Sequence, residues 1–403
     1  MTKAIKVITN NILDKNKRVI LKPGKDKPIR NRHHWIFSGA IEPLPEFTNG
    51  DFLNVFSSQN EFLGSAYFNR KSTIVGRMIA FDATAPLQAI QQNLDSAIAL
   101  RTSLFDVSKT NAYRLVNGEG DCLPGLVIDK YDDVLVVQIS TLGMEKLSPW
   151  LVDYLINKLQ PRAIYEKSAL AARKEEGLAP VQRSLYGPIV DEVQVRENGL
   201  QFAVSIVDGQ KTGFFIDHRE MRQWVKELSA DKRVLNCFSY TGAFSVYAAA
   251  GHAVKVDSVD ISERAIELAR RNMLLNGLSI DQHGWQAADV FQFLRERELN
   301  YDLVILDPPA FAKRHKDVIP ACRGYKDINR VAMQKMPAKS MLLTCSCSYH
   351  VDEELFKKVI FQAAVEAGRN VRIIGSHRMA SDHPINVCHP ESDYLKSLLL
   401  YVE

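Results

Sequence analysis

The second half of the chain alternates short apolar runs with amphipathic segments, and this alternation constrains the fold more than any other feature. The runs "RVLNCFSY", "AVKVDSVDIS", "YDLVILDPP" and "KSMLLTCS" are typical of buried strands, and helical patterns such as "ERAIELARRNMLLNG" separate them. Strands that alternate with helices form βαβ units and a parallel sheet. We therefore expect residues 191–403 to form a doubly wound α/β domain.

The first half of the chain has a different pattern and predicts two further domains. Within residues 1–77, short β-rich segments such as "DFLNVFSSQ" and "FLGSAYFN" are separated by Gly, Pro, Asn and Ser, which predicts a small β-rich domain. Residues 78–190 combine an amphipathic helix pattern over 85–105 with strands "GLVID" and "VLVVQIS", joined by the hairpin-like turn "KYDD". This stretch predicts a middle α/β domain.

Composition excludes several classes of protein. The chain has 403 residues, 46% of them apolar and 24% charged, which is typical of a globular protein with a full core. No apolar run approaches the roughly 20 residues that span a bilayer, and the N-terminus has no apolar signal-peptide segment. Six scattered cysteines are too few for a disulfide framework. We expect a cytoplasmic protein with reduced thiols.

Positive charge is concentrated at the N-terminus. Residues 1–34 contain ten Lys or Arg and only two acids, although the whole chain has a net charge of only +4. Such a block can be a solvated face or a phosphate-binding surface. The stretch "RNRHHWIF" adds imidazoles and an indole that can stack on bases, which favours RNA or DNA binding. Lys27, Arg30 and Arg32 are the candidate contacts.

Acidic residues follow the predicted strands at the edge where open parallel sheets bind ligands. Gly242 lies in the strand-to-helix turn "LNCFSYTGAFS", and Asp260 follows about 20 residues later, where a carboxylate can bind ribose hydroxyls. Asp260 could instead cap the next helix. Asp289 follows a third strand, and Asp307 opens an Asp-Pro-Pro turn after "LVIL". A single glycine is not a G-x-G-x-x-G motif, so a nicotinamide dehydrogenase is disfavoured.

These motifs together resemble a known family. "NCFSYTG", "VDIS", "ADV" and "DPPAF" are similar, in this order, to class I S-adenosylmethionine-dependent methyltransferases. "VDGQKTGFFIDHREMR" and "ACRGYKDINR" resemble the RlmI-type ribosomal RNA cytosine-5 methyltransferases, and "NGEGDCLPGLVIDKYDDVLVVQ" is similar to their middle domain. The basic N-terminal unit resembles their PUA-like RNA-binding domain. One departure is Ala243, where the family pattern usually has a second glycine.

The resemblance covers essentially the whole chain and implies a Rossmann-like methyltransferase domain, a homodimer, and ribosomal RNA of the large (23S) subunit as substrate. Lys211 and Arg219 would pair with the methionine carboxylate and Phe214 would cover the cofactor, although Asp217 could equally be a helix cap. The residues implied to bind S-adenosylmethionine are Lys211, Phe214, Asp217, Arg219, Asn236, Phe238, Tyr240, Thr241, Gly242, Asp260, Ile261, Asp289, Val290, Asp307 and Pro308. Those implied to contact RNA phosphate and a stacked base are Arg323, Tyr325 and Lys326.

Two cysteines near the end of a strand, in "LLTCSCSYH", suggest how the reaction proceeds. Carbon 5 of cytosine becomes nucleophilic when a thiolate adds to carbon 6, and Asp307 can hydrogen-bond to the ring. Cys347 lies beyond the strand end and matches the family's "SCS" motif, whereas Cys345 lies within the apolar run. We expect Cys347 and Asp307 to be catalytic, with Cys345 and Cys322 as rival nucleophiles.

Other functions remain open from the sequence. A zinc site could use both cysteines with Cys388 and His389, and the cysteines could also form a redox pair. An amino-group methyltransferase acting on adenine or guanine would use the Asp-Pro-Pro motif without a cysteine. A non-catalytic RNA-binding or ribosome-assembly protein could have kept the fold.

Overall fold

The computed structural model describes residues 17–312 and 314–403, so the first 16 residues of the basic segment lie outside the described part. The described chain forms two compact units. The first contains residues 17–193, 204–214 and 381–392, and the second contains 194–203, 215–380 and 393–403. The division into domains 1–77, 78–190 and 191–403 stays a prediction.

The first unit begins with a five-stranded sheet in the order β1-β3-β4-β5-β2. Buried residues alternate along β3, and the side chains of Val19, Ile36, Val55 and Phe68 form a small core on this sheet. The elements are β1 (Arg18–Ile20), α2 (Lys27–Arg30), β2 (Trp35–Phe37), η1 (Ser38–Ala40), β3 (Phe52–Phe56), β4 (Phe62–Phe68) and β5 (Ile74–Ala80).

A second five-stranded sheet follows in the same unit, in the order β10-β9-β8-β7-β6. Strands β7 and β8 pair antiparallel through a turn in which Asp132 has a φ of 57°, so the predicted hairpin is present. The elements are α3 (Pro86–Leu104), β6 (Ala112–Asn117), η2 (Gly118–Asp121), β7 (Leu126–Tyr131), β8 (Val134–Ile139), α4 (Leu142–Lys146), α5 (Ser148–Leu159), β9 (Ala163–Ser168), α6 (Ala171–Glu175) and β10 (Val181–Tyr186). A two-stranded hairpin, β11 (Glu192–Glu197) and β12 (Leu200–Ser205), comes next in the chain.

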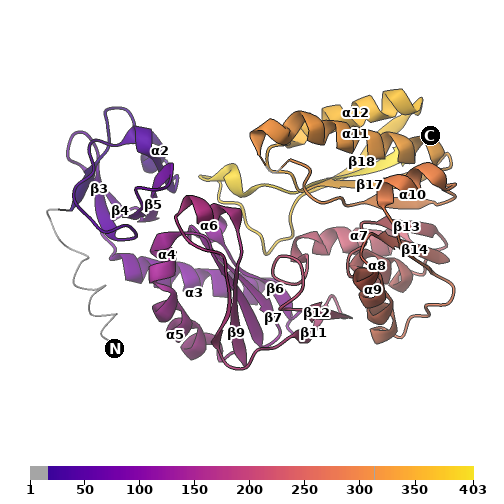
Figure 1. Cartoon of the computed structure of the whole chain (residues 1–403), viewed down its shortest axis with the longest axis horizontal. Coiled ribbons are helices and arrows are strands. Elements are labelled where there is room, and N and C mark those ends of the chain that lie inside the picture. Colours follow the sequence, from indigo (N-terminus) through magenta and orange to yellow (C-terminus); the bar gives the residue numbers. More distant parts are fainter. Residues whose placement is uncertain (1–16, 313) are drawn as a thin grey trace. The chain divides into compact units, whose positions relative to one another are not determined.

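The second unit contains the doubly wound sheet that the alternation predicted. Its order is β15-β14-β13-β16-β17-β19-β18, with β13 to β17 parallel and β19 antiparallel to both neighbours. Helices α7, α8 and α9 cover one face and α10, α11 and α12 the other (Figure 1). The strands are β13 (Arg233–Cys237), β14 (Lys255–Asp260), β15 (Gly284–Ala287), β16 (Leu303–Leu306), β17 (Ser340–Ser346), β18 (Val371–His377) and β19 (Lys396–Val402). The helices of this unit are η3 (Ile216–His218), α7 (Arg219–Leu228), α8 (Ala243–Ala250), α9 (Glu263–Leu275), α10 (Val290–Glu296), η4 (His315–Asp317), α11 (Val318–Lys335) and α12 (Glu353–Ala367). A further short helix, η5 (Pro390–Ser392), belongs to the first unit.

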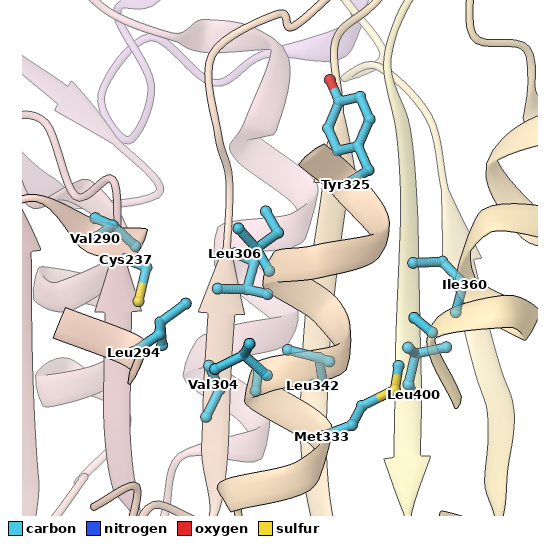
Figure 2. Packing of buried hydrophobic residues seen from close by; sticks show 14 of the residues in the cluster. Cys237, Val290, Leu294, Val304, Leu306, Tyr325, Met333, Leu342, Ile360 and Leu400 are labelled. Atoms are coloured by element: carbon cyan, nitrogen blue, oxygen red, sulfur yellow. The ribbon is translucent and has the colours of Figure 1, made fainter. Parts of the chain in front are cut away.

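The core of this sheet consists of aliphatic side chains between the strands and α10, α11 and α12. Val304, Leu306 and Leu342 project from β16 and β17, and Leu294, Met333 and Ile360 project from the helices onto them (Figure 2). Such a packed layer fixes the carboxyl ends of the strands in a rigid edge. Among the described residues, no helix is long and apolar enough to cross a membrane.

Candidate functional site

The loop after β13 is tied to the end of β14 by one carboxylate. Asp260 accepts hydrogen bonds from the backbone N–H of Tyr240 (2.8 Å) and of Ser262 (3.0 Å). Ser262, not Asp260, is the N-cap of α9, because its side chain accepts from the N–H of Ala265. The alternative interpretation of Asp260 as a helix cap is therefore wrong, and its carboxylate instead shapes the loop.

The same loop has an unusual backbone conformation. Phe238, Tyr240 and Gly242 have φ values of 58°, 45° and 73°, in the left-handed region. At Gly242 an added Cβ would lie 2.5 Å from the Cβ of Ala269 in α9, so close packing of α8 against α9 requires glycine there. Asn236 and Thr241 are buried beside this turn, and the Oδ1 atom of Asn236 has no hydrogen-bond partner among the described residues.

The carboxyl ends of β14 and β15 carry the next three predicted residues. Ile261 is 75% exposed. Asp289 is also exposed and caps α10 by accepting from the N–H of Gln292 at 2.9 Å. Val290 points into the core (Figure 2). Only the main chain of Val290 is thus available to a ligand in this arrangement.

Asp307 at the end of β16 faces a histidine that the sequence did not single out. The Nε2 atom of His218 lies 3.3 Å from the Oδ2 atom of Asp307, and the imidazole is buried against Phe244. Ligand atoms of His218, Asp307 and Cys345 all lie within 4.8 Å of one another. The imidazole and the carboxylate are therefore close enough to form an ion pair if the histidine is protonated.

The two cysteines of β17 differ in burial. Cys345 is 0% exposed, and burial together with the nearby Asp307 carboxylate raises the pKa of its thiol well above the usual value. Cys347 lies just past the strand, is partly exposed, and has its Sγ atom 3.8 Å from the carbonyl oxygen of Pro308. Burial also raises the pKa of the third candidate thiol, Cys322. Since the thiolate is the nucleophile, these surroundings disfavour Cys345 although it lies close to Asp307.

The residue after Cys347 is the centre of a buried network. The hydroxyl of Ser348 accepts from the N–H of Ala312 (3.1 Å) and shares a 2.9 Å hydrogen bond with the hydroxyl of Tyr325. The ammonium group of Lys396 donates to the carbonyl oxygens of Ser348 and Tyr394, both at 2.7 Å. Burial lowers the pKa of Lys396 to about 8. These contacts hold the Asp-Pro-Pro loop and the Cys347 turn together.

The RNA-stacking role predicted for Tyr325 does not fit the structure. Tyr325 belongs to α11 and is 0% exposed. The ring packs 4.6 Å from that of Phe311, and Figure 2 shows it at the edge of the core with its hydroxyl directed away from the aliphatic side chains. Arg323 on the same helix is exposed, and Lys326 is ion-paired with Glu366. Of the three residues, Arg323 is the most accessible to RNA.

The segment before α7 is divided between the two units. Asp217 and Arg219 are buried in the second unit, where Asp217 accepts a 2.6 Å hydrogen bond from Tyr394, and the N-cap position of α7 is occupied by His218. Arg219 lies 3.5 Å from Glu197, a carboxylate also held by Arg222. Lys211 and Phe214 belong to the first unit, where Lys211 is exposed and Phe214 is buried.

The predicted RNA contacts near the N-terminus lie on and beside α2. Lys27 and Arg32 are exposed. Arg30 is ion-paired with Asp26 and Glu61, so part of its charge is already neutralised. Of the three candidate contacts, Lys27 and Arg32 therefore offer the more accessible charge.

Comparison with known proteins identifies the family. Residues 173–367 match a family of S-adenosylmethionine-dependent methyltransferases, and residues 19–81 match a PUA-like domain. Ribosomal RNA large subunit methyltransferase I from Alteromonas mediterranea is 41% identical over 392 residues, which cover 96% of this chain and 98% of that protein. The chain belongs to this methyltransferase family. Ribosomal RNA large subunit methyltransferase I from Shewanella denitrificans is 40% identical over 395 residues, which cover 96% of this chain and 99% of that protein.

Solved structures support the same family and fold. The structure of a putative methyltransferase from Streptococcus mutans is 25% identical in sequence and has a TM-score of 0.81. The match covers 95% of this chain and 99% of the Streptococcus mutans chain. A putative methyltransferase complexed with SAH is 26% identical with a TM-score of 0.83 and the same coverage. The predicted family, the PUA-like and Rossmann-like folds, and the cofactor S-adenosylmethionine are thereby confirmed.

Proposed function

We propose that this RlmI-type methyltransferase makes 5-methylcytosine in large-subunit ribosomal RNA through a covalent adduct of Cys347. The observation that carries the proposal is the pair of cysteines at the end of β17. Cys347 is partly exposed beside the Asp-Pro-Pro loop, whereas Cys345 is sealed in the core. A nucleophile must reach the target base, which leaves its stack to enter such a site.

The residues of the loop after β13 fit S-adenosylmethionine. Each oxygen of the Asp260 carboxylate accepts one backbone hydrogen bond. Each carboxylate oxygen has a second lone pair, so Asp260 can also accept from both ribose hydroxyls. The other proposed cofactor contacts in the second unit are those the family resemblance implies, from Asp217 to Pro308. When bound, the cofactor supplies an electrophilic methyl group.

The chain's own groups would carry out the rest of the reaction. The Cys347 thiolate adds to carbon 6, and the electron pair of the 5,6 double bond moves to carbon 5, which takes the methyl group. Asp307, sharing a proton with His218 at 3.3 Å, donates a hydrogen bond to ring nitrogen 3 and stabilises the adduct. Transfer of the carbon 5 proton to water returns the electron pair of the carbon–hydrogen bond to the 5,6 double bond and expels Cys347 as a thiolate.

Ribosomal RNA is the proposed partner, and the PUA-like domain with Lys27 and Arg32 is its proposed binding surface. A homodimer and a cytoplasmic location remain proposals that light scattering and cell fractionation would test. An assembly role without catalysis would require that the purified protein not bind S-adenosylmethionine in calorimetry.

The decisive experiment is mass-spectrometric mapping of modified nucleotides in ribosomal RNA from cells with and without this protein. We expect one 5-methylcytosine of the large subunit to disappear and to return with the wild-type gene but not with Cys347→Ala. Loss of a methylated adenine or guanine amino group would instead establish the competing activity. That alternative is weakened by Phe311, whose ring packs between Phe291 and Tyr325.

A further inference from the structure

The first unit contains a cluster of titratable side chains, none of which belongs to the proposed methyltransferase site. It consists of His33, in the loop before β2, and of His389 and Glu391 from the segment 381–392. One potential ligand atom from each residue lies within 4.8 Å of the other two. The Nε2 atom of His33 is 3.0 Å from Oε1 of Glu391, and Nε2 of His389 is 3.6 Å from Oε2.

Part of this cluster is buried without the hydrogen bonds that its atoms need. His389 is 1% exposed, and its Nδ1 atom has no hydrogen-bond partner among the described residues. The Oε2 atom of Glu391 is likewise buried without a hydrogen-bond partner in the described part of the chain. Buried polar atoms without partners are unfavourable, and of these two atoms Oε2 of Glu391 faces the other members of the cluster, where it could bind a further group.

From this geometry we propose that His33, His389 and Glu391 bind a divalent transition-metal ion of the zinc class. Two imidazoles and one carboxylate form a familiar three-ligand set for Zn²⁺, which leaves a fourth position for water. Ligand atoms of a tetrahedral zinc site are about 3.3 Å apart, since each is roughly 2.0–2.1 Å from the metal. The carboxylate of Glu391 lies between the two imidazoles, with Oε1 3.0 Å from Nε2 of His33 and Oε2 3.6 Å from Nε2 of His389, and both distances are close to this value.

A further carboxylate and an indole lie beside the cluster. The negative charge of Glu119 favours the protonated form of His389, against the larger opposite effect of burial. Glu119 also accepts a 2.8 Å hydrogen bond from the indole of Trp35. The indole ring contacts His389 edge-on, with ring centres 4.5 Å apart.

The ligand types restrict which ion can bind. Imidazole nitrogens suit Zn²⁺, Co²⁺ and Ni²⁺, whereas Mg²⁺ and Ca²⁺ prefer oxygen ligands. Binding through Nε2 of His33 places its proton on Nδ1 and costs one long hydrogen bond, the 3.2 Å contact from the N–H of Trp35. A bound ion would cross-link residues 33 and 389, and so fasten the segment 381–392 to the β-rich sheet.

The test uses the full chain without a polyhistidine tag, stripped of metal by a chelator. Zinc is titrated in competition with a chromophoric chelator, and cobalt is titrated as a spectroscopic probe. We expect one equivalent of zinc to bind with a Kd of about 1 µM or lower. Cobalt should give the visible bands of a tetrahedral site without a thiolate charge-transfer band, because no cysteine belongs to the cluster.

Variants then locate the site. His33→Gln, His389→Gln and Glu391→Gln should each weaken zinc binding by about 100-fold, and zinc should raise the melting temperature of the wild type more than that of these three variants. Because His389 is buried, the half-buried Glu391 provides the variant that is expected to fold. His252→Asn, an exposed histidine of the other unit, is the control and should bind as the wild type. The proposal would be overturned if His33→Gln and Glu391→Gln bound zinc as tightly as the wild type. It would also be overturned if the wild type bound no stoichiometric zinc at about 100 µM, which is 100 times the expected Kd.

Discussion

The ammonium group of Lys396 donates a 2.7 Å hydrogen bond to the carbonyl oxygen of Ser348, the residue that follows the proposed nucleophile. Lys396 reaches this position because it pairs with Ser346 across the antiparallel strands β17 and β19. It is 4% exposed, and its charge interacts with that of Cys347. A buried cation beside a thiol favours the thiolate form.

Replacing Lys396 by methionine should therefore make Cys347 a weaker nucleophile. The pH profile of Cys347 alkylation, followed by peptide mass spectrometry, should shift upward by about 0.5–1 unit. The pKa of Lys396 is lowered to about 8, so the lysine is charged below that pH and neutral above it. The advantage of the wild type should thus fade as the pH rises through about 8. Lys358→Met, an exposed lysine on α12, is the control, and identical profiles for Lys396→Met and wild type would remove Lys396 from this role.

Gly242 and Gly277 offer a matched pair of stability tests. Both have left-handed φ values, 73° and 66°, but only at Gly242 would a new Cβ collide with Ala269. Gly277→Ala should cost roughly 1 kcal/mol from backbone strain alone, whereas Gly242→Ala should cost about 2–5 kcal/mol from strain plus overpacking. Urea unfolding measures both, and an equal decrease in stability would show that packing against α9 is not what requires glycine.

Asp260→Ala should weaken binding of S-adenosylmethionine by about 1–3 kcal/mol, because the ribose hydroxyls of the cofactor would lose their hydrogen-bond acceptor. The backbone N–H groups of Tyr240 and Ser262 would also lose their acceptor. Calorimetric titration provides the measurement, with Asp281→Ala, a carboxylate in an exposed loop, as the control. If the affinity is unchanged, Asp260 does not belong to the cofactor site.

Neutralising Lys27 and Arg32 together should weaken RNA binding and flatten its dependence on salt. For every ion pair with phosphate that is removed, the slope of log K against log salt should decrease by about 0.7–0.9. Arg30→Gln alone should have a smaller effect, since Asp26 and Glu61 already pair with Arg30. Lys357→Gln on α12 is the comparison, and a slope unaffected by the double change would mean that this charge is only a solvated face.

Local sequence patterns predicted the parts of this molecule that depend on local physics. Apolar runs, turn residues and helix caps are determined by neighbouring positions, so the parallel strands and the acids at their ends, such as Asp260 and Asp307, were predicted. The burial of Cys345 followed in the same way from the apolar run around it.

Residues whose roles depend on tertiary pairing could not be predicted in this way. His218 and Lys396 carry no local signal, and only the meeting of η3 with β16 and of β17 with β19 brings them to the site. Tyr325 was misjudged because its role rested on a family resemblance, which does not show whether a side chain is buried. In fact Tyr325, Ile328 and Ala332 lie three and four residues apart on the buried face of α11.

The central claim, that Cys347 is the nucleophile, is tested most directly by trapping with RNA that carries 5-fluorocytosine at the target position. Thiolate addition and methyl transfer can proceed, but fluorine cannot leave as a proton does, so the bond from sulfur to carbon 6 should persist. Wild type and Cys345→Ala should form the adduct, which mass spectrometry should locate on Cys347 in both. Cys347→Ala should form none while still binding S-adenosylmethionine. An adduct that survives in Cys347→Ala and disappears in Cys345→Ala or Cys322→Ala would contradict the assignment.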